Sequence, residues 1–254
     1  MTAHQYDGLF FDYIEAGARE SARTVVARMR GLLEIRSVLD VGCGRGIWLD
    51  EWTRQGVADV MGLDGDYVPI ESMAVPVEKF RAVDLSKPIE LGRRYDFVQS
   101  LEVAEHLPPD SSETLVATLV RHGDVILFGA ARPGQGGEHH VNERPYWYWR
   151  DLFRRHGYGL YDAVRPLIQA STIEPWYRYN SFLFAADSVA ARLPASVRGT
   201  LVRDDAPIVD LAPWWWRARC RALSMLPRRT INHIAQAKHL SVLGWRRAAS
   251  RLHR

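Results

Sequence analysis

Two glutamates and a histidine in the middle of the chain are spaced so that they could hold a metal ion together. Glu102, Glu105 and His106 stand at positions i, i+3 and i+4, which places them on one face if the segment forms a helical turn. Two carboxylates side by side repel each other, and one tends to take up a proton unless a cation lies between them. Carboxylates and imidazoles are ligands of divalent metals, so the spacing predicts a metal site. The alternative is ordinary hydrogen bonding along a helix face.

A glycine-rich stretch further along the chain supplies two more imidazoles. Residues 132–143 have the composition of a loop, and functional residues concentrate on loops at strand ends. His139 and His140 are adjacent, so their side chains point apart in most conformations. One of them can complete the metal shell while the other acts as a general base or faces solvent. The alternative is that both histidines only shape the loop.

A second chemical signal is an acid followed by three glycines. An aliphatic run leads into Asp40 and then into Gly42, Gly44 and Gly46. This pattern predicts a buried strand, a tight turn and the start of a helix. The spacing differs from the Gly-x-Gly-x-x-Gly of dinucleotide-binding folds. A carboxylate at this place would repel phosphate and suits a cationic ligand.

Acids also end the next two predicted strands. Residues 57–64 end in Asp64, whose carboxylate can accept hydrogen bonds from both hydroxyls of a ribose. Residues 80–85 form a short strand that ends in Asp84 and Leu85. Three acids at three successive strand ends indicate one ligand site along the edge of a sheet.

These features together resemble the class I S-adenosylmethionine (SAM) methyltransferases. In that family the glycine loop holds the methionine end of SAM, the acid after the second strand binds the ribose, and the acid after the third binds the adenine amino group. The resemblance therefore implies SAM as cofactor, bound by Asp40, Gly42, Gly44, Gly46, Asp64, Gly65, Asp84, Leu85 and Ser100.

Two longer segments resemble a bacterial subgroup of this family. They are LEVAEHLP (residues 101–108) and GQGGEHHVNE (residues 134–143). Members of the subgroup occur with glycan and secondary-metabolite genes. One departure is Arg144-Pro145, where the subgroup has Gln-Trp. The resemblance therefore does not determine which residues form the acceptor side of the site.

The Glu-x-x-Glu-His spacing is similar to that of terminal 2′-O-methyltransferases of small RNAs and of ubiquinone-pathway O-methyltransferases. In the RNA enzymes a later histidine, three residues before a glutamate, joins the metal ligands. His140 and Glu143 have this spacing, so the resemblance makes His140 the fourth ligand beside the two glutamates and His106. His139 is the reserve ligand and a candidate base, and His106 and His140 are the other candidate catalytic histidines.

The elements that position these residues follow from hydrophobic periodicity. An apolar stripe over residues 22–33 predicts a helix over 15–35 that packs on the sheet. Further strands are predicted over 95–101, 124–130, 157–164 and 180–187, and further helices over 111–121 and 144–156. The expected fold is therefore a doubly wound α/β sheet of seven strands, within a methyltransferase domain over residues 1–187.

Composition places the chain among ordinary globular proteins. Its 254 residues are 47% hydrophobic and 25% charged, enough for one domain with an appendage. Two cysteines are too few for a disulfide framework, which favours a reducing compartment. The first residues lack the pattern of a signal peptide, and no apolar run could span a bilayer. A cytoplasmic protein is expected.

The C-terminal part differs in charge from the rest. Residues 188–212 are expected as a linker, and residues 213–254 as a basic, helical extension with ten Arg and Lys and no acid. Residues 1–212 hold 23 basic and 30 acidic residues. Three tryptophans, Trp214 to Trp216, beside arginines fit an anionic membrane surface, so peripheral attachment at the inner face is expected. Nucleic acid is a less favoured partner, and helices folding back on the acidic body are a further alternative.

The sequence thus predicts SAM-dependent O-methylation of a hydroxyl on a sugar, glycan or other polyol, assisted by a divalent metal such as Mg²⁺. Two alternatives are methylation of an RNA ribose 2′-hydroxyl and a non-catalytic, membrane-recruited SAM-binding protein.

Overall fold

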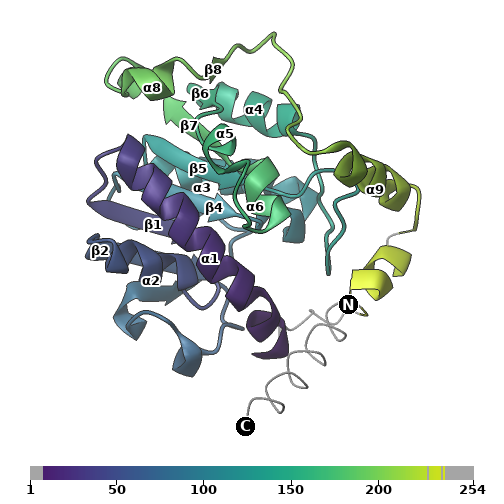
Figure 1. Cartoon of the computed structure of the whole chain (residues 1–254). Helices are drawn as coiled ribbons and strands as arrows, with labels where there is room; N and C mark the ends of the chain where they lie inside the picture. The colour runs from purple at the N-terminus through teal and green to yellow at the C-terminus, as the bar shows by residue number, and fades with distance from the viewer. Residues whose placement is uncertain (1–7, 228, 236, 238–254) are drawn as a thin grey trace.

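A single mixed sheet organises the molecule (Figure 1). The computed structural model describes residues 8–227, 229–235 and 237. Within them the sheet has eight strands in the order β3-β2-β1-β4-β5-β7-β6-β8. The strands are β1 (Ser37–Val41), β2 (Asp59–Asp64), β3 (Phe80–Ala82), β4 (Phe97–Leu101), β5 (Val125–Gly129), β6 (Tyr158–Tyr161), β7 (Phe182–Ala186) and β8 (Leu201–Val202). The expected count of seven strands is corrected to eight, because β8 pairs antiparallel with β6.

Strands β1 to β5 run parallel, whereas β6 and β7 form an antiparallel pair at one side. The central strands are covered on both faces, which explains their nearly continuous apolar sequences. Asp40 near the end of β1 lies opposite Gly62 of β2 and Gln99 of β4. Because β1 and β4 are neighbours, the chain reverses its order between them, and ligands of such folds bind outside the carboxyl ends of the strands at this point.

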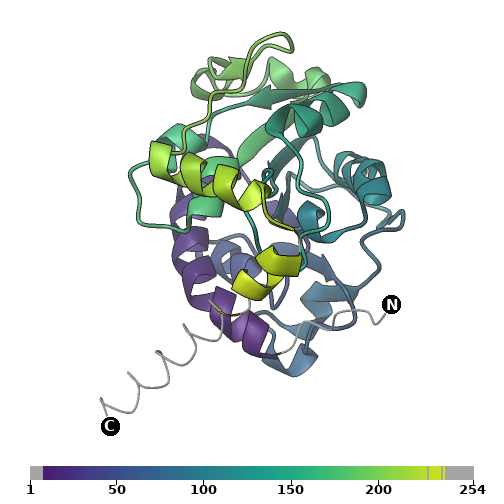
Figure 2. The same cartoon turned by 90° about the vertical axis from the view of Figure 1, so that its right-hand side faces the viewer.

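Helices cover both faces of the sheet, with α1 and α3 on opposite sides (Figure 2). The α-helices are α1 (Gly8–Leu32), α2 (Ile47–Arg54), α3 (Ser112–His122), α4 (Tyr146–Arg155), α5 (Arg165–Ile168), α6 (Pro175–Asn180), α7 (Asp187–Ala190), α8 (Ala195–Arg198) and α9 (Trp214–Ser224). Four 3-10 turns are η1 (Ile70–Ser72), η2 (Val77–Lys79), η3 (Ala104–His106) and η4 (Pro109–Ser111). The apolar stripe of α1 packs as its periodicity predicts, with Ala22, Val26 and Met29 fully buried.

Residues 188–212 are not an extended linker. They end α7, form α8 and add β8 to the sheet. Val197 of α8 is fully buried, and the guanidinium of the fully buried Arg165 donates to the Val209 carbonyl at 3.0 Å. Buried apolar and hydrogen-bonded groups tie this stretch to the domain, which explains why proline and glycine content alone mispredicted it.

The start of the basic segment also packs on the body. Trp216 and Cys220 of α9 are buried in a small cluster with Tyr179 and Ala212. Residues 229–235 form a further helical stretch that follows α9 (Figure 2). The rest of the expected extension, residues 228, 236 and 238–254, lies outside the described residues. Within the described part of the chain, no helix combines the length and apolarity needed to cross a membrane.

Candidate active site

A cavity of about 440 Å³ opens at the carboxyl edge of the central strands. Of the residues predicted to bind SAM, its lining includes Asp40, Gly42, Gly44, Asp64 and Leu85. Its lining also includes the predicted metal ligands Glu102, Glu105, His106 and His140. The structure therefore brings the two predicted chemical centres into one space. Predicted residues outside the lining are Gly46, Gly65, Asp84, Ser100 and His139.

The glycine loop is shaped to let a ligand approach the backbone. Gly42 has a φ of 87°, and a Cβ built there would lie 2.2 Å from a methyl group of Val103. Only glycine satisfies both the left-handed conformation and the close contact. The Gly42 amide donates to the Leu63 carbonyl at 2.7 Å, which fixes the loop across the end of β2. Gly46 serves as the N-cap of α2 rather than as part of the wall.

Two carboxylates face this loop from β1 and β2. Burial raises the pKa of Asp40 to about 7, a hydrogen bond from Gln99 works against this rise, and the nearby charge of Asp64 adds to it. Asp64 accepts hydrogen bonds from the amides of Gly44 and Gly65, both at 2.7 Å, and from the hydroxyl of Tyr67. Burial raises the pKa of Asp64 as well, although these donors oppose the shift. A cationic ligand would stabilise both groups in their ionised form.

The third acid lies away from the cavity. Asp84 is exposed two residues beyond β3, and its carboxylate accepts from the amide of Ser86 at 2.9 Å and from its hydroxyl at 2.6 Å. These hydrogen bonds hold the pKa of Asp84 below its usual range. Such a local turn is what an aspartate after a strand commonly forms. The neighbouring Leu85 does line the cavity.

Glu102 does not share a helical face with Glu105 and His106, contrary to the prediction. It has a φ of 56°, and the 3-10 turn η3 begins only at Ala104. The carboxylate of Glu102 accepts from the Gln135 amide at 2.6 Å and from the Asn180 amide at 3.0 Å. Glu102 thereby ties the glycine-rich loop to α6, and it also lies close enough to Glu105 and His140 to interact with both.

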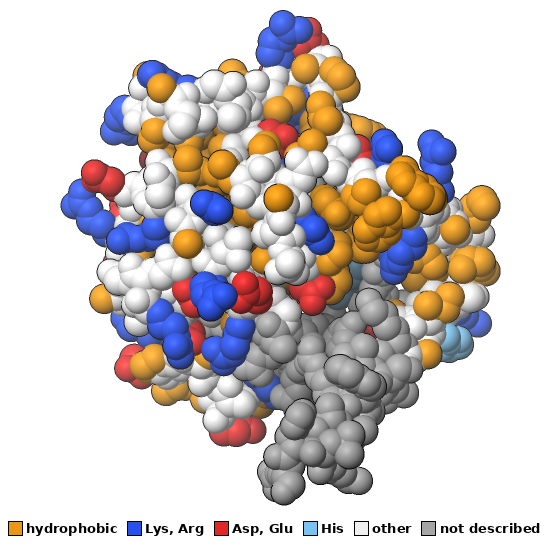
Figure 3. Space-filling model, in the orientation of Figure 1, with side chains coloured by type: hydrophobic (Ala, Val, Ile, Leu, Met, Phe, Trp, Pro, Cys, Tyr) orange, Lys and Arg blue, Asp and Glu red, His pale blue; other side chains and the backbone are white. Residues whose placement is uncertain are grey.

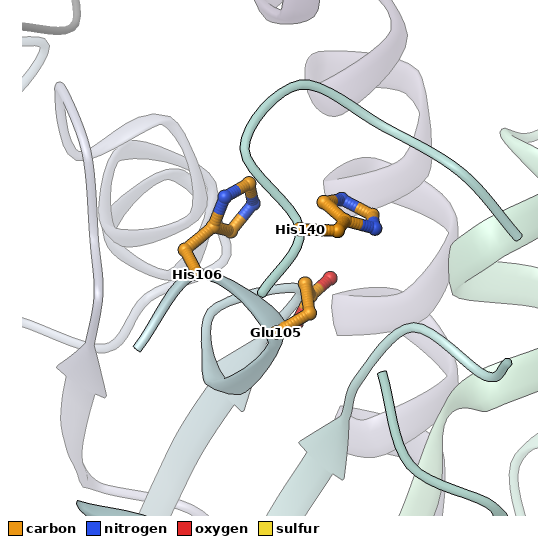
Figure 4. Close-up of side chains that lie close together, drawn as sticks. All are labelled: Glu105, His106 and His140. Carbon is orange, nitrogen blue, oxygen red and sulfur yellow. The ribbon is translucent and has the colours of Figure 1, made fainter. Parts of the chain in front are cut away.

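Glu105, His106 and His140 come together as a cluster (Figure 4). One ligand atom from each lies within 4.8 Å of the others. Both carboxylate oxygens of Glu105 are buried and neither meets the geometry of a hydrogen bond. Burial, and then the charge of Glu102, raise the pKa of Glu105 well above its usual range. A buried acid facing two imidazoles fits a cation, which would remove the cost of its charge.

The residues after His140 bring it to this place. The amides of Val141 and Asn142 donate to the Glu105 carbonyl at 2.8 and 3.0 Å. The Asn142 side chain donates to the Ala104 carbonyl at 3.1 Å. The loop is thus pinned to η3 by three hydrogen bonds, so His140 reaches Glu105 although the two are 35 positions apart in the chain.

Glu143 orients the imidazole of His140. Nδ1 of His140 lies 2.9 Å from a Glu143 carboxylate oxygen, which also accepts from the Gly136 amide at 2.8 Å. Although burial raises the pKa of Glu143, the hydrogen bond and charge of His140 outweigh it and hold that pKa below its usual range. An ionised Glu143 favours the proton on Nδ1, which leaves the lone pair of Nε2 for a metal ion or an acceptor proton.

His139 is placed differently from its neighbour. It has a φ of 57°, and its backbone amide donates to the Asn232 side chain at 3.3 Å. Its side chain contributes neither to the cavity lining nor to the metal cluster. Of the two adjacent histidines, only His140 lines the cavity and belongs to the cluster.

Sequence reasoning missed the wall on the acceptor side of the cavity. This wall comes from the C-terminal segment and consists of Trp216, Arg219, Leu223, Ile231, Ile234 and Ala235. The charge of the segment suggested a separate function, and the packing signal was limited to a few apolar positions among arginines. Gln135 and Asn142 were missed because amide side chains in a loop have no distinctive pattern.

A glycine loop after β1, acids facing it and a cavity at the switch point of a doubly wound sheet define a SAM-dependent methyltransferase. Residues 13–176 match the family described as a methyltransferase domain, and the chain belongs to this family.

The curated relatives share part of the chain. A ubiquinone biosynthesis O-methyltransferase of Bordetella avium is 36% identical over 118 residues, which cover 41% of this chain and 46% of that protein. The Proteus mirabilis protein of the same description is 36% identical over 101 residues, covering 37% of this chain and 41% of that protein. The match spans less than half of these relatives.

Solved structures support the same fold. The methyltransferase domain of bacterial CtHen1 has a TM-score of 0.51 at 16% identity, covering 67% of this chain and 98% of that one. A candidate O-methyltransferase from Nostoc punctiforme has a TM-score of 0.53 at 11% identity, covering 73% of this chain and 63% of that one.

Proposed function

We propose that the protein transfers the methyl group of SAM to one hydroxyl of a vicinal diol on a sugar, glycan or related polyol, and that a divalent cation held by Glu105, His106 and His140 assists. The observation that carries this proposal is the position of the three side chains in the same cavity as the glycine loop. The curated relatives are named as O-methyltransferases, which supports oxygen as the acceptor atom.

The residues divide the work between the two ends of the cavity. Asp40 and Asp64, on the donor side, would hold the cationic methionine end and the ribose of SAM. A cation bound by the cluster would bring two neighbouring hydroxyls together and lower the pKa of the one that reacts. Glu102, through Gln135 and Asn180, keeps the loop and α6 in place beside that acceptor.

The reaction breaks the bond between the SAM sulfur and its methyl carbon and forms a bond from that carbon to the acceptor oxygen. The sulfonium becomes a neutral thioether, and the hydroxyl loses its proton. An imidazole nitrogen that binds the cation has no lone pair for this proton, so only a nitrogen of His106 or His140 left unbound by the cation could accept it. His139 lies outside the cavity lining. Alignment of donor and acceptor supplies most of the remaining rate enhancement.

The observed donor set bears on which cation binds. Mg²⁺ prefers oxygen ligands, and the sequence suggested two carboxylates. Glu105, His106 and His140 provide one carboxylate and two imidazoles. Glu102 accepts from two amides but also interacts with Glu105 and His140, so it offers a second carboxylate beside this set. Imidazole nitrogens suit Fe²⁺ and Zn²⁺, whereas carboxylates suit Mg²⁺ and Mn²⁺, so all four ions are candidates for this mixed set.

A screen tests the function directly. The purified protein, stripped of metal and reloaded with each of Mg²⁺, Mn²⁺, Fe²⁺ or Zn²⁺, is incubated with SAM and a panel of sugars and glycosides that contain vicinal diols. Methyl transfer that depends on the added metal, with the product methylated on oxygen, is the expected result. Equal activity before and after chelation would reject the role of the cation. Preferential methylation of an RNA 3′ end would reject the sugar as acceptor and favour the RNA ribose.

We also propose that the outward face of α9 binds an anionic membrane surface. Trp214 is 74% exposed and Met225 is 78% exposed, and the exposed Arg217 and Arg221 lie on the same helix. Figure 3 shows hydrophobic and basic side chains next to each other in the region of α9. Exposed indoles insert at the depth of the lipid headgroups, and neighbouring arginines attract anionic lipids.

A further inference from the structure

The inner face of the C-terminal segment supplies part of the cavity wall. Trp216, Arg219 and Leu223 project from α9 at spacings of three and four, so they share one side of the helix. Ile231 and Ile234, from the following helical stretch, continue the wall. We call these five residues, together with Ala235, the C-terminal wall. They border the same space as Glu105 and the histidines of the cluster.

Close contacts fix the C-terminal wall against the glycine-rich loop. The Arg219 guanidinium donates to the Gln135 carbonyl at 2.8 Å. A Cβ built on Gly134 would lie 2.0 Å from the Cys220 carbonyl oxygen, and one on Gly136 would lie 3.1 Å from Ile231. The loop that carries His140 is therefore fitted to α9 with no room for side chains. The C-terminal wall and the metal cluster are parts of one assembled site.

The chemistry of this wall differs from that of the cluster. Leu223 and Ile231 are only half-buried and Ile234 is 47% exposed, although each lines the cavity. Trp176, from α6, also lines the cavity and adds a further apolar surface. Apolar side chains that face a cavity instead of the core gain burial only when a ligand covers them. A free sugar offers only the small C–H patches of its ring faces and would leave much of this surface in contact with water.

We infer that the acceptor is a glycoside with a hydrocarbon aglycone: the metal cluster holds the diol, and the C-terminal wall holds the apolar group attached to the same ring. This inference rests on the proposed function and names its substrate class. Arg219 stands at this wall with its guanidinium 5.0 Å from the Trp216 ring centre and bound to Gln135, so it stiffens the wall.

The test compares matched acceptors. Methyl and hexyl glycosides of the same hexopyranose are offered to the metal-loaded protein with SAM, and initial rates give KM for each. In parallel, quenching of tryptophan fluorescence in the protein loaded with S-adenosylhomocysteine measures binding without turnover. The hexyl compound is expected to have a KM and a Kd at least about tenfold lower than those of the methyl compound.

Two variants locate the effect. Leu223→Gln places a polar group in the wall, whereas Met225→Gln makes the same kind of change at a 78%-exposed position outside the cavity lining. Leu223→Gln should remove most of the hexyl preference, so that the ratio of the two KM values approaches one, whereas Met225→Gln should alter neither this ratio nor the binding of S-adenosylhomocysteine.

The outcomes separate the inference from the function it rests on. Equal KM and Kd for the two glycosides, or equal loss for both in Leu223→Gln, would overturn the apolar acceptor while leaving sugar methylation intact. Tighter binding of the hexyl compound with no methylation of either would support the wall and reject the proposed reaction.

Discussion

The two ends of the cavity are built in different ways. The donor end, around Asp40, Gly42 and Asp64, comes from one strand-loop-helix unit and the strand that follows it. The acceptor end combines η3, the loop around His140 and the C-terminal wall, which are far apart in the chain. The donor end therefore follows from local sequence, whereas the acceptor end exists only after long-range packing.

The two ends also differ in how their carboxylates are satisfied. Asp64 accepts hydrogen bonds from two backbone amides and a hydroxyl, which are part of the loop itself. Glu105 is equally buried, yet neither of its oxygens has a partner in hydrogen-bonding geometry among the described residues. The Asp64 carboxylate is thus satisfied by its own loop, whereas Glu105, like one oxygen of Asp40, has its charge stabilised only if a cationic ligand binds beside it.

The largest expected effect separates the adjacent histidines. His140→Ala should lower kcat/KM for the acceptor by at least about 100-fold and reduce bound metal, because it removes a member of the cluster. His139→Ala should change kcat/KM less than about threefold, since this side chain lies outside the cavity lining. Both variants should bind S-adenosylhomocysteine normally by calorimetry. Equal losses of kcat/KM in the two variants would show that activity depends on the conformation of the loop and not on the cluster.

At the donor end, a methyl group on Gly42 should act on SAM alone. Gly42→Ala should weaken S-adenosylhomocysteine binding at least about tenfold, because the added Cβ meets Val103 in a strained backbone. Gly56→Ala is the matched control, since Gly56 has a φ of 90° with no atom within 4 Å of the added Cβ. Calorimetry of both variants checks this. A loss of metal binding in Gly42→Ala would mean that the two ends are not independent.

SAM binding should depend on pH through Asp40. An acid with a raised pKa is ionised above that value, so affinity should be full above pH 7 and fall as pH drops through about 7. The expected decrease between pH 8 and pH 6 is about tenfold if only the ionised form binds. Asp40→Asn should bind weakly with a flatter profile. An unchanged slope in this variant would assign the titration to another group.

The smallest expected effect concerns the outward face of α9. Replacing Trp214 and Trp215 by alanine should weaken sedimentation with vesicles of anionic phospholipid by at least about fivefold. Turnover of a water-soluble glycoside should remain the same, because neither side chain lines the cavity. Sedimentation with vesicles of neutral phospholipid shows how much of the binding depends on the anionic charge. Undiminished binding by the double variant would reject the membrane surface as the partner of this face.

Much of the donor end could be predicted because its signals are local. The run into Asp40 and the alternate glycines specify a strand, a turn with positive φ and a helix start, and in the structure β1 ends at Val41 and α2 begins at Ile47, directly after Gly46. Asp84 shows the limit of such reasoning. Its type and place matched an adenine ligand, but a hydrogen-bonded turn with Ser86 holds it away from the cavity.

The acceptor end was predicted in its residue types and not in its geometry. Spacing at i, i+3 and i+4 assumes a helix, yet Glu102 adopts a left-handed conformation before η3 and turns to Gln135 and Asn180. Those two amides come from segments 33 and 78 residues away, so no local pattern could reveal them. For the basic segment a membrane surface was favoured and folding back on the body was only an alternative, because its charges hide the few apolar positions that pack inward.

The sequence by itself determined the class of enzyme and the ends of the strands that hold the methyl donor, since backbone conformation there is set by neighbouring residues. Tertiary structure alone decided which glutamate meets the histidines and which segment closes the acceptor side. Those choices depend on hydrogen bonds and apolar contacts between residues that are distant in the chain, and such contacts exist only in the folded domain.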